Sequence, residues 1–494
     1  MASRRGSGNT CVCRVCDGVR ARLNKIFTVL DTYGWLLDTY IVDFFEDDVW
    51  SKLPGDWRKV LGHTSPEELG EWILPGSLGN TSSVRVWPLS LLAFRETIKV
   101  LGINRDYPTE ELLKCYGSEQ SNCNEELQNL PQTTKRKLVD PKYDQLFTKS
   151  VKKKKRHEIE NIAKTTSELA TLAKCECIID IGAGMGHLAR TLAYNYGLCV
   201  VCLEQDELLS DQARKCDENL LALLKKKMPD ILARNPHHIS TKVSDSDIQG
   251  EELAKKLINE LQLNFGLDES KAGFGLIGLH SCGNLAATLL KFHATQKESR
   301  FICIVGCCYM KITPGYETME TASFGYPLSK HVSMANNHGL SYAALEVACH
   351  AIENYSDKLR TGDYHDLLVH AYRATLEVVL IRKNGKSMRR SHLKNVKLKR
   401  DMSFQYCLNA TEILKPENQP DPTDLNTDEV SNCLNRWREV VAFGTLRFML
   451  APLVETAVLL DRFLYLSERN LTPSLRPIFD PRVSPRNIVL TAWK

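Results

Sequence analysis

The sequence lacks a strong charge of either sign, and it lacks an uncharged apolar run long enough to cross a membrane. Its net charge is +4 over 494 residues, with 43% hydrophobic and 25% charged residues, a balance typical of soluble globular proteins. The most apolar stretch, residues 440–466, contains Arg447, Glu455 and Asp461, whereas a membrane helix needs ~20 predominantly apolar residues in a row. We expect a buried helix pair broken near Pro452 and keep 440–466 as a weak membrane candidate.

The N-terminus also lacks a signal sequence, which bears on the 17 cysteines. Residues 1–8 are polar and basic without an apolar core, and several cysteines lie in apolar strand-like runs such as 198–203. We therefore expect reduced thiols in the cytoplasm, the nucleus or both. Cys11, Cys13 and Cys16 have no second cysteine or histidine pair close by in the sequence, so the sequence assigns no metal to them.

What the chain does contain is a glycine-rich turn between an apolar run and a helix start, at residues 177–190. Asp180 follows the apolar run, and Gly182, Gly184 and Gly186 come after it at alternate positions. Glycine allows backbone angles that other residues avoid and lets a ligand approach the backbone. Such a turn typically holds a nucleotide-like ligand at the carboxyl end of a strand. The alternative is a glycine turn in an α/β domain that binds nothing.

The charge of Asp180 indicates which ligand this would be. A carboxylate there would repel the pyrophosphate of a dinucleotide and attract an amino group, and His187 replaces the third glycine of the dinucleotide pattern. The next strand ends at Glu204, where an acid can accept the ribose hydroxyls. We predict S-adenosyl-L-methionine as the cofactor, held by Asp180, Gly182, Gly184, Gly186, His187, Glu204 and, near the adenine, Asp245.

Helices and strands alternate after this turn. Further strands are expected at 198–203, 238–243, 274–279, 301–305, 375–382 and 487–493. The pattern predicts an α/β class I (Rossmann-like) seven-stranded sheet with a helical N-terminal domain and a helical insertion before the last strand. The expected parts are a flexible 1–18, a helical domain 19–140, a catalytic core 141–385, an insertion 386–480 with a basic segment, a linker at 416–428 and helices, and a final strand within 481–494.

Two basic segments are candidates for contact with RNA. One runs from Lys152 to Arg156, just ahead of the first strand, and the other from Arg389 to Arg400. Clustered cations can hold the phosphates of a nucleic acid. A solvated helix face or a nuclear targeting signal is the alternative.

Side chains that can act as bases, hydrogen-bond donors or nucleophiles follow the fourth and fifth strands, at the edge of the sheet where ligands bind. We predict His280 as a base or orienting group, with Asn284 and Tyr309 as donors near the acceptor. Cys282 and Cys308 are the alternative, as nucleophiles for methylation of carbon. A metal site of His280, Cys282, Cys307 and Cys308 is a third interpretation, and inert buried thiols are the fourth.

Four ordered motifs together resemble the methyltransferase-like protein 25 family, and within it the 25B branch described as containing a ribosomal RNA adenine dimethylase domain. They are Lys-Lys-Arg-His-Glu at 154–158, Asp-x-Gly-x-Gly-x-Gly-His-Leu at 180–188, Leu-His-Ser-Cys-Gly-Asn-Leu at 279–285 and Gly-Cys-Cys-Tyr at 306–309. The resemblance runs from about residue 33 to the C-terminus. It implies a seven-stranded S-adenosylmethionine-dependent methyltransferase.

The acceptor does not follow from the resemblance. Adenine dimethylases carry an Asn/Asp-Pro-Pro-aromatic loop after the fourth strand, whereas this chain has His-Ser-Cys-Gly-Asn at 280–284, so adenine dimethylation is not expected. We predict methyl transfer to an undefined acceptor, with RNA or protein favoured. The competing hypothesis is an inactive methyltransferase-like fold that binds RNA or protein. The sequence does not fix the oligomeric state.

Overall fold

The computed structural model describes residues 11–74, 85–107, 113–115, 146, 151–229, 234–243, 252–266, 273–315, 324–362, 365–396 and 404–494. The chain forms two compact units, each built from segments that are distant in the sequence. Unit 1 comprises residues 1–28, 103–340 and 455–494, and unit 2 comprises 29–102 and 341–454. The domain boundaries that the sequence predicted at residues 18, 140, 385 and 480 do not coincide with the limits of these two units. They stay predictions.

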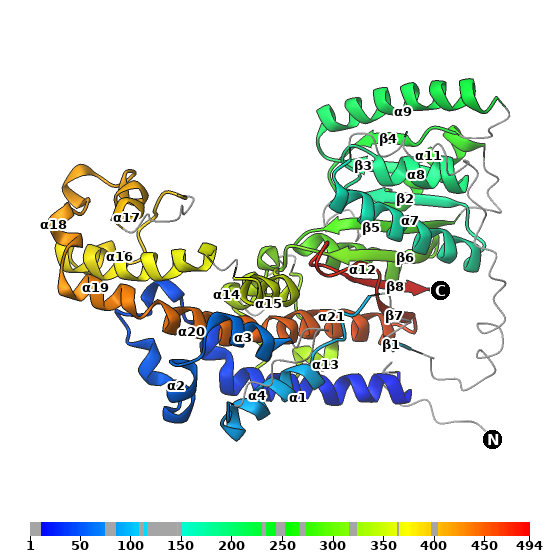
Figure 1. Ribbon diagram of the computed structural model, residues 1–494. Coiled ribbons are helices and arrows are strands. Elements are labelled where there is room, and N and C mark those ends of the chain that lie inside the picture. Colours follow the sequence, from blue (N-terminus) through cyan, green and yellow to red (C-terminus); the bar gives the residue numbers. More distant parts are fainter. Residues whose placement is uncertain are drawn as a thin grey trace, which may run out of the picture. The chain divides into compact units, whose positions relative to one another are not determined.

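Unit 1 is an α/β structure around one mixed sheet of eight strands (Figure 1). The strands are β1 (Leu113–Lys114), β2 (Cys177–Ile181), β3 (Cys199–Glu204), β4 (His237–Ser240), β5 (Phe274–Ser281), β6 (Ser299–Gly306), β7 (Thr472–Pro477) and β8 (Ile488–Trp493). Their order is β1-β7-β8-β6-β5-β2-β3-β4. The five strands from β4 to β6 are parallel, and β8 runs antiparallel to both of its neighbours.

Helices connect the parallel strands of this sheet, as the sequence pattern predicted. They are α8 (His187–Tyr196), α9 (Glu207–Lys227), α11 (Glu252–Phe265) and α12 (Asn284–Thr295), and a further helix, α7 (Lys153–Leu172), precedes β2. The unit also holds the start of α1 (Arg14–Asp38), the 3₁₀ turn η5 (Tyr309–Lys311), α13 (Lys330–Ser333) and most of α21 (Ala451–Ser467). Since parallel strands need crossover connections, β2 to β6 all present their carboxyl ends on the same edge.

One strand predicted from the sequence is wrong, and two strands of the sheet were not predicted. Residues 375–382 lie inside the helix α16 (Leu368–Asn384) and not in a strand. A run rich in β-branched residues fits a buried helix as well as a strand. The sheet instead takes β7 from 472–477, next to the C-terminal strand β8, and adds the two-residue β1 at its edge.

Unit 2 is helical. Its α-helices are α2 (Gly55–Leu61), α3 (Pro66–Ile73), α4 (Leu89–Leu101), α14 (Tyr342–Val347), α15 (Ile352–Arg360), α16, α17 (Phe404–Thr411), α18 (Pro422–Leu425), α19 (Asp428–Asn435) and α20 (Trp437–Met449). Its 3₁₀ turns are η1 (Ile41–Asp43), η2 (Val49–Lys52), η6 (His365–Leu367), η7 (Lys386–Met388) and η8 (Pro416–Asn418). The helix α3 begins with a capping box, in which Ser65 and Glu68 exchange hydrogen bonds and Pro66 takes the first helical position.

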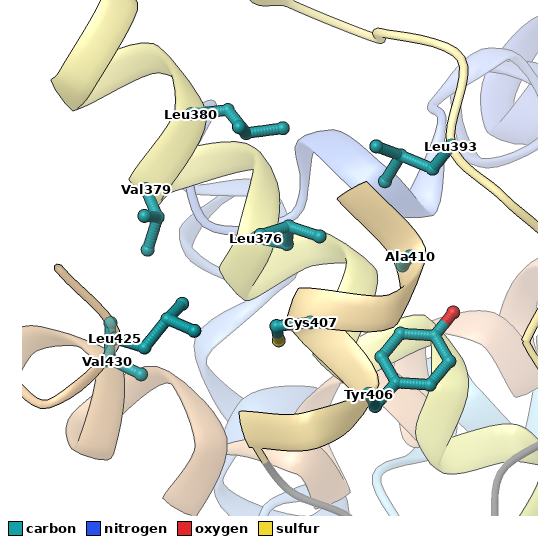
Figure 2. Close-up of a cluster of buried hydrophobic side chains, with 9 residues drawn as sticks. All are labelled: Leu376, Val379, Leu380, Leu393, Tyr406, Cys407, Ala410, Leu425 and Val430. Atoms are coloured by element: carbon teal, nitrogen blue, oxygen red, sulfur yellow. The ribbon is translucent and has the colours of Figure 1, made fainter. Parts of the chain in front are cut away.

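A buried cluster in unit 2 explains two differences from the sequence predictions. It surrounds one face of α16 and contains Leu376, Val379, Leu380, Leu393, Tyr406, Cys407, Ala410, Leu425 and Val430 (Figure 2). The helical spacing of its first three members favours helix over strand for α16. The linker expected at 416–428 is wrong as well, because Leu425 packs in this cluster and Lys383 pairs with Asp421 and Asp424.

The apolar stretch near the C-terminus is a helix pair, as expected, with α20 ending at Met449 and α21 beginning at Ala451. Among the described residues, 437–467 is the single stretch that passes a length and composition test for crossing a membrane, and 83% of its most apolar window is buried inside the protein. Burial of this kind is what the core helices of a globular protein show.

Candidate functional site

The glycine turn between β2 and α8 leaves open space over two of its three glycines. Gly182, Gly184 and Gly186 all have positive φ angles, at 73°, 56° and 68°, which residues other than glycine rarely adopt. A side chain built on Gly182 or Gly184 would meet no atom within 4 Å, whereas one on Gly186 would meet His238 at 2.9 Å. The first two glycines therefore border a space that a ligand can fill, and the third permits close packing.

Asp180 lies at the end of β2 beside this space. Its residue is 2% exposed, and no side chain or backbone group in the described part of the chain donates a hydrogen bond to its carboxylate. Burial, together with the nearby Glu204, raises the pKa of Asp180 to about 7. The amino group of a ligand would supply the missing donor and positive charge.

Glu204 ends β3 on the other side of the glycine turn. Its two carboxylate oxygens accept hydrogen bonds from the backbone amides of Gly184, at 2.9 Å, and Asp206, at 3.1 Å. Because a carboxylate can accept about four hydrogen bonds, Glu204 retains capacity for two hydroxyls. The side chain is half-buried and fixed by two amides, so it is held ready for a diol such as a ribose.

A buried charged network holds the glycine turn, and the sequence analysis did not detect it. The Arg190 guanidinium donates to the carboxylate of Asp217 and to the carbonyl of Met185, and His238 lies 2.7 Å from Asp217 through Nε2. Arg190 also contacts Nδ1 of His187 at 3.1 Å. Burial and the Arg190 charge lower the pKa of His187 to about 4, so its ring is neutral at pH 7.

His280 lies at the carboxyl end of β5 and pairs with a buried acid from α7. Its Nε2 atom is 3.6 Å from Oε2 of Glu158, which is 3% exposed and accepts a 2.6 Å hydrogen bond from Ser484. Burial raises the pKa of Glu158, but the nearby His280 side chain and the hydrogen bond from Ser484 outweigh it and lower the pKa below its ordinary value. An ionised Glu158 therefore orients a half-exposed imidazole at the rim of the site.

Three cysteines converge at the carboxyl ends of β5 and β6, and we call them the strand-end thiol cluster: Cys282, Cys307 and Cys308. The Sγ atom of Cys282 lies 2.7 Å from that of Cys307 and 3.3 Å from that of Cys308. Hydrogen bonding with these two thiols lowers the pKa of Cys282 to about 5, against the cost of burial. All three are partly exposed. His280 does not belong to the set of ligand atoms that lie close enough together for one metal ion.

Asn284 and Tyr309, predicted as donors to an acceptor, already have partners. The Asn284 side chain donates to Thr313 Oγ1 at 3.0 Å and accepts from the Thr313 amide at 2.8 Å. Tyr309 is 2% exposed and donates to Glu455 at 3.2 Å. Both residues support the loops around the site in this structure, and a direct catalytic role for either one stays a prediction.

Arg462, a residue that the sequence analysis did not single out, lies behind β6. It is 2% exposed, and its Nε atom has no hydrogen-bond partner among the described residues. Its guanidinium lies over the ring of Tyr309 at 5.9 Å and close to Gly306. Burial lowers the pKa of Arg462. The Arg462 side chain thus lies at the end of β6, close enough to Cys307 for an electrostatic interaction.

The two basic segments differ in how much positive charge they leave available. Lys155 lies close enough to the site to lower the pKa values of Asp180 and His187, and Lys154 interacts with Glu158 at 3.8 Å. In unit 2, by contrast, Arg389 and Arg390 both pair with the buried Asp43, and Lys394 pairs with Glu412. Residues 397–400 of that segment, and Asp245 of the predicted cofactor site, lie outside the described residues.

Comparisons with known proteins agree with this geometry. Residues 154–315, which contain α7, the glycine turn and both strand ends, match a family model described as "Methyltransferase domain". Two curated relatives are named "Probable methyltransferase-like protein 25". The mouse protein is 27% identical over 226 residues, and the human protein is 27% identical over 225 residues.

These matches are partial. Each covers 44% of this chain, and they cover 37% of the mouse protein and 36% of the human protein. A solved structure, "Crystal structure of 23S rRNA methyltransferase ErmE", is 14% identical to this chain. The match covers 30% of this chain and 46% of that structure's chain, with a TM-score of 0.18. The chain therefore carries a methyltransferase domain at 154–315, and over 44% of its length it is similar to proteins named methyltransferase-like protein 25.

Proposed function

We propose that the chain is an S-adenosylmethionine-dependent methyltransferase of class I, close to the 25B branch of its relatives, and that it acts on RNA or protein. The observation that carries this proposal is Asp180, a buried carboxyl without a hydrogen-bond donor at the end of β2. The open space over Gly182 and Gly184 and the fixed carboxylate of Glu204 support it. These groups are suited to one ligand that carries an amino group, a short linking segment and a ribose.

In this proposal Asp180 binds the amino group and Glu204 the two ribose hydroxyls, while the turn at Gly182 and Gly184 lies against the body of the ligand. S-adenosylmethionine supplies a methyl group bonded to a sulfonium, which is a good leaving group. The protein therefore contributes mainly position and orientation. The Arg190–Asp217–His238 network keeps the turn in its strained conformation and so keeps Asp180 and Glu204 in place.

The pair His280–Glu158 suits an acceptor that must lose a proton. The half-exposed imidazole can accept this proton, and the ionised Glu158 behind it stabilises the resulting imidazolium. The lysines at 152–155 lie at the start of the same helix, α7, and would attract an acceptor with phosphates or acidic side chains. We propose a cytoplasmic or nuclear location, in keeping with a chain of 17 cysteines whose described members form no disulfide bond.

Calorimetric titration of S-adenosylmethionine into the wild type, Asp180→Asn and Glu204→Gln tests the cofactor site. Both variants keep the shape of the side chain and remove its charge. Each should weaken binding by roughly 10- to 100-fold, because a hydrogen bond to a charged group contributes about 1.5–3 kcal/mol. Glu218→Gln is the matched control, since this acid is exposed on α9, and it should bind like the wild type.

Folded wild-type protein that does not bind S-adenosylmethionine would overturn the proposal. If binding is confirmed, transfer of a labelled methyl group into RNA and protein pools identifies the acceptor class. His280→Gln should then abolish labelling while cofactor binding is retained. Binding with no transfer to any acceptor pool would favour the alternative, a methyltransferase-like fold that acts by interaction.

A further inference from the structure

Four cysteine side chains meet at the edge of the sheet in unit 1, far from the glycine turn in the sequence. Cys11 and Cys13 precede α1, Cys16 lies in the first turn of α1, and Cys115 directly follows β1. We call these four the N-terminal thiol cluster. The Sγ atom of Cys115 lies 3.6, 3.9 and 3.5 Å from those of Cys11, Cys13 and Cys16. All four sulfur atoms lie within 4.8 Å of one another.

These distances are those of sulfur atoms around a single metal ion. Zn²⁺ binds thiolates at about 2.3 Å in a tetrahedron, which places neighbouring sulfurs about 3.8 Å apart. A disulfide needs a sulfur–sulfur distance of about 2.05 Å and uses each sulfur once, whereas Cys115 approaches three sulfurs equally. An iron–sulfur cluster holds its cysteines on different iron atoms and would spread the four sulfurs further than is observed.

The chemistry of the ligand set agrees with its geometry. Thiolates are soft ligands that select zinc over magnesium or calcium, and four cysteines make a closed structural site with no position for water. Cys13 and Cys16 have the Cys-x-x-Cys spacing of many such sites, and the Cys16 amide points at the Cys13 sulfur at 3.5 Å. Arg20 donates to the Cys11 carbonyl at 2.7 Å and pairs with Asp17, which fixes the approach to α1.

We propose that Cys11, Cys13, Cys16 and Cys115 bind one Zn²⁺ ion that joins the start of α1 to strand β1 of the sheet. The strand has two residues and pairs with β7 alone, with one further hydrogen bond from the Cys115 amide to the Pro473 carbonyl at 2.9 Å. So short a strand is marginal by itself. The ion closes a loop of 99 positions between Cys16 and Cys115 and holds β1 against β7.

Elemental analysis of the full-length chain, purified without chelators, tests this site directly. Cys115→Ser should lower the zinc content by one equivalent per chain. Cys216→Ser, at an exposed cysteine of α9, is the matched control and should leave the zinc content unchanged. Cys282→Ser tests the strand-end thiol cluster and should also retain this equivalent. A folded wild type without zinc, or an equivalent lost in Cys282→Ser and kept in Cys115→Ser, overturns the proposal.

A second measurement on the wild type keeps the test decisive if Cys115→Ser does not fold. Each cysteine is alkylated and quantified by mass spectrometry, first in the purified protein and then after removal of metal with a strong chelator. Cys11, Cys13, Cys16 and Cys115 should be protected together and become reactive together, while Cys216 reacts in both states. Reactivity of the four that the chelator does not change, or an intramolecular disulfide among them, contradicts a zinc site.

Discussion

The two thiol clusters of unit 1 contain the same residue type in opposite surroundings. The N-terminal thiol cluster brings four sulfurs together, and three of its cysteines are buried. The strand-end thiol cluster has three sulfurs, all partly exposed, at the edge of the sheet where parallel strands end. Four ligands close a tetrahedral site, whereas three thiols beside His280 and Arg462 leave a side open to a reactant. Their positions in the fold therefore suit the N-terminal thiol cluster to a structural role and the strand-end thiol cluster to a chemical one.

The largest expected effect is on stability and concerns the N-terminal thiol cluster. Removing bound zinc from the wild type with a chelator, or replacing Cys115 with Ser, should lower the thermal midpoint by about 5–10 °C, because metal binding to the folded chain contributes folding free energy. Differential scanning fluorimetry measures this shift. The chelator should have no effect on Cys115→Ser, and Cys282→Ser should melt like the wild type. An equal fall in the thermal midpoint of both variants would contradict a stabilising role that is specific to the N-terminal thiol cluster.

The second effect concerns the cofactor site and its pH dependence. The pKa of Asp180 is raised to about 7, and a cationic amino group binds the ionised carboxyl. Affinity should therefore be highest at least about one pH unit above 7 and fall as the carboxyl takes up a proton, by about 25-fold between about pH 7.5 and 5.5. Calorimetry at several pH values checks this. In Asp180→Asn the dependence should disappear, and in Cys115→Ser it should persist, because the thiol cluster does not form part of this site.

Thiol reactivity should distinguish the strand-end thiol cluster by its pH profile. Since two neighbouring thiols lower the pKa of Cys282 to about 5, its thiolate is fully formed near pH 6. Its alkylation rate should therefore be nearly constant between about pH 6 and 8, whereas that of a free cysteine peptide, with a pKa near 8.5, rises about tenfold per pH unit over most of this range. A rate at Cys282 that rises like that of the peptide would mean that its neighbours do not activate the Cys282 thiol.

The smallest effect concerns the acid behind His280. The pKa of Glu158 is lower than its ordinary value, so its stabilising contribution is present above about pH 4.5 and is lost as the pH falls through the lower value in the folded state. Glu158→Gln should cost about 1 kcal/mol at neutral pH and less in acid. Chemical denaturation followed by circular dichroism at several pH values measures this, with Glu218→Gln as control. A constant cost at every pH would assign Glu158 a packing role alone.

Features that depend on neighbours in the chain were predictable. The strand, glycine turn and helix at 177–190 are encoded within fourteen positions, and β-branched and glycine residues have strong local preferences there. The same holds for the capping box at Ser65 and for the helix pair that breaks at residue 450. For 375–382 the local signal was ambiguous, because an apolar run fits either a strand or a buried helix. Packing around Leu376 and Val379 settles it as helix.

Features that depend on distant residues could not be predicted in this way. Arg390 looks like a cation for RNA in the sequence, but in the fold it pairs with Asp43, 347 positions away. Glu158 and Ser484 meet across 326 positions. Cys115 joins three cysteines about a hundred positions before it, and without it those three lacked the fourth ligand of a metal site. No local pattern encodes such pairs, because they form through the packing of elements that are separated along the chain.

The sequence by itself determined the strand, glycine turn and helix at 177–190, because β-branched residues and glycine have strong local preferences, and it placed the acids Asp180 and Glu204 before and after them. The tertiary structure alone decided what surrounds that turn. It buried Asp180 without a donor, put Glu158 behind His280, and sorted the cysteines into a closed and an open cluster. The physical reason is that burial, pKa and metal-binding geometry depend on how many groups converge at a point, and convergence is a property of the fold.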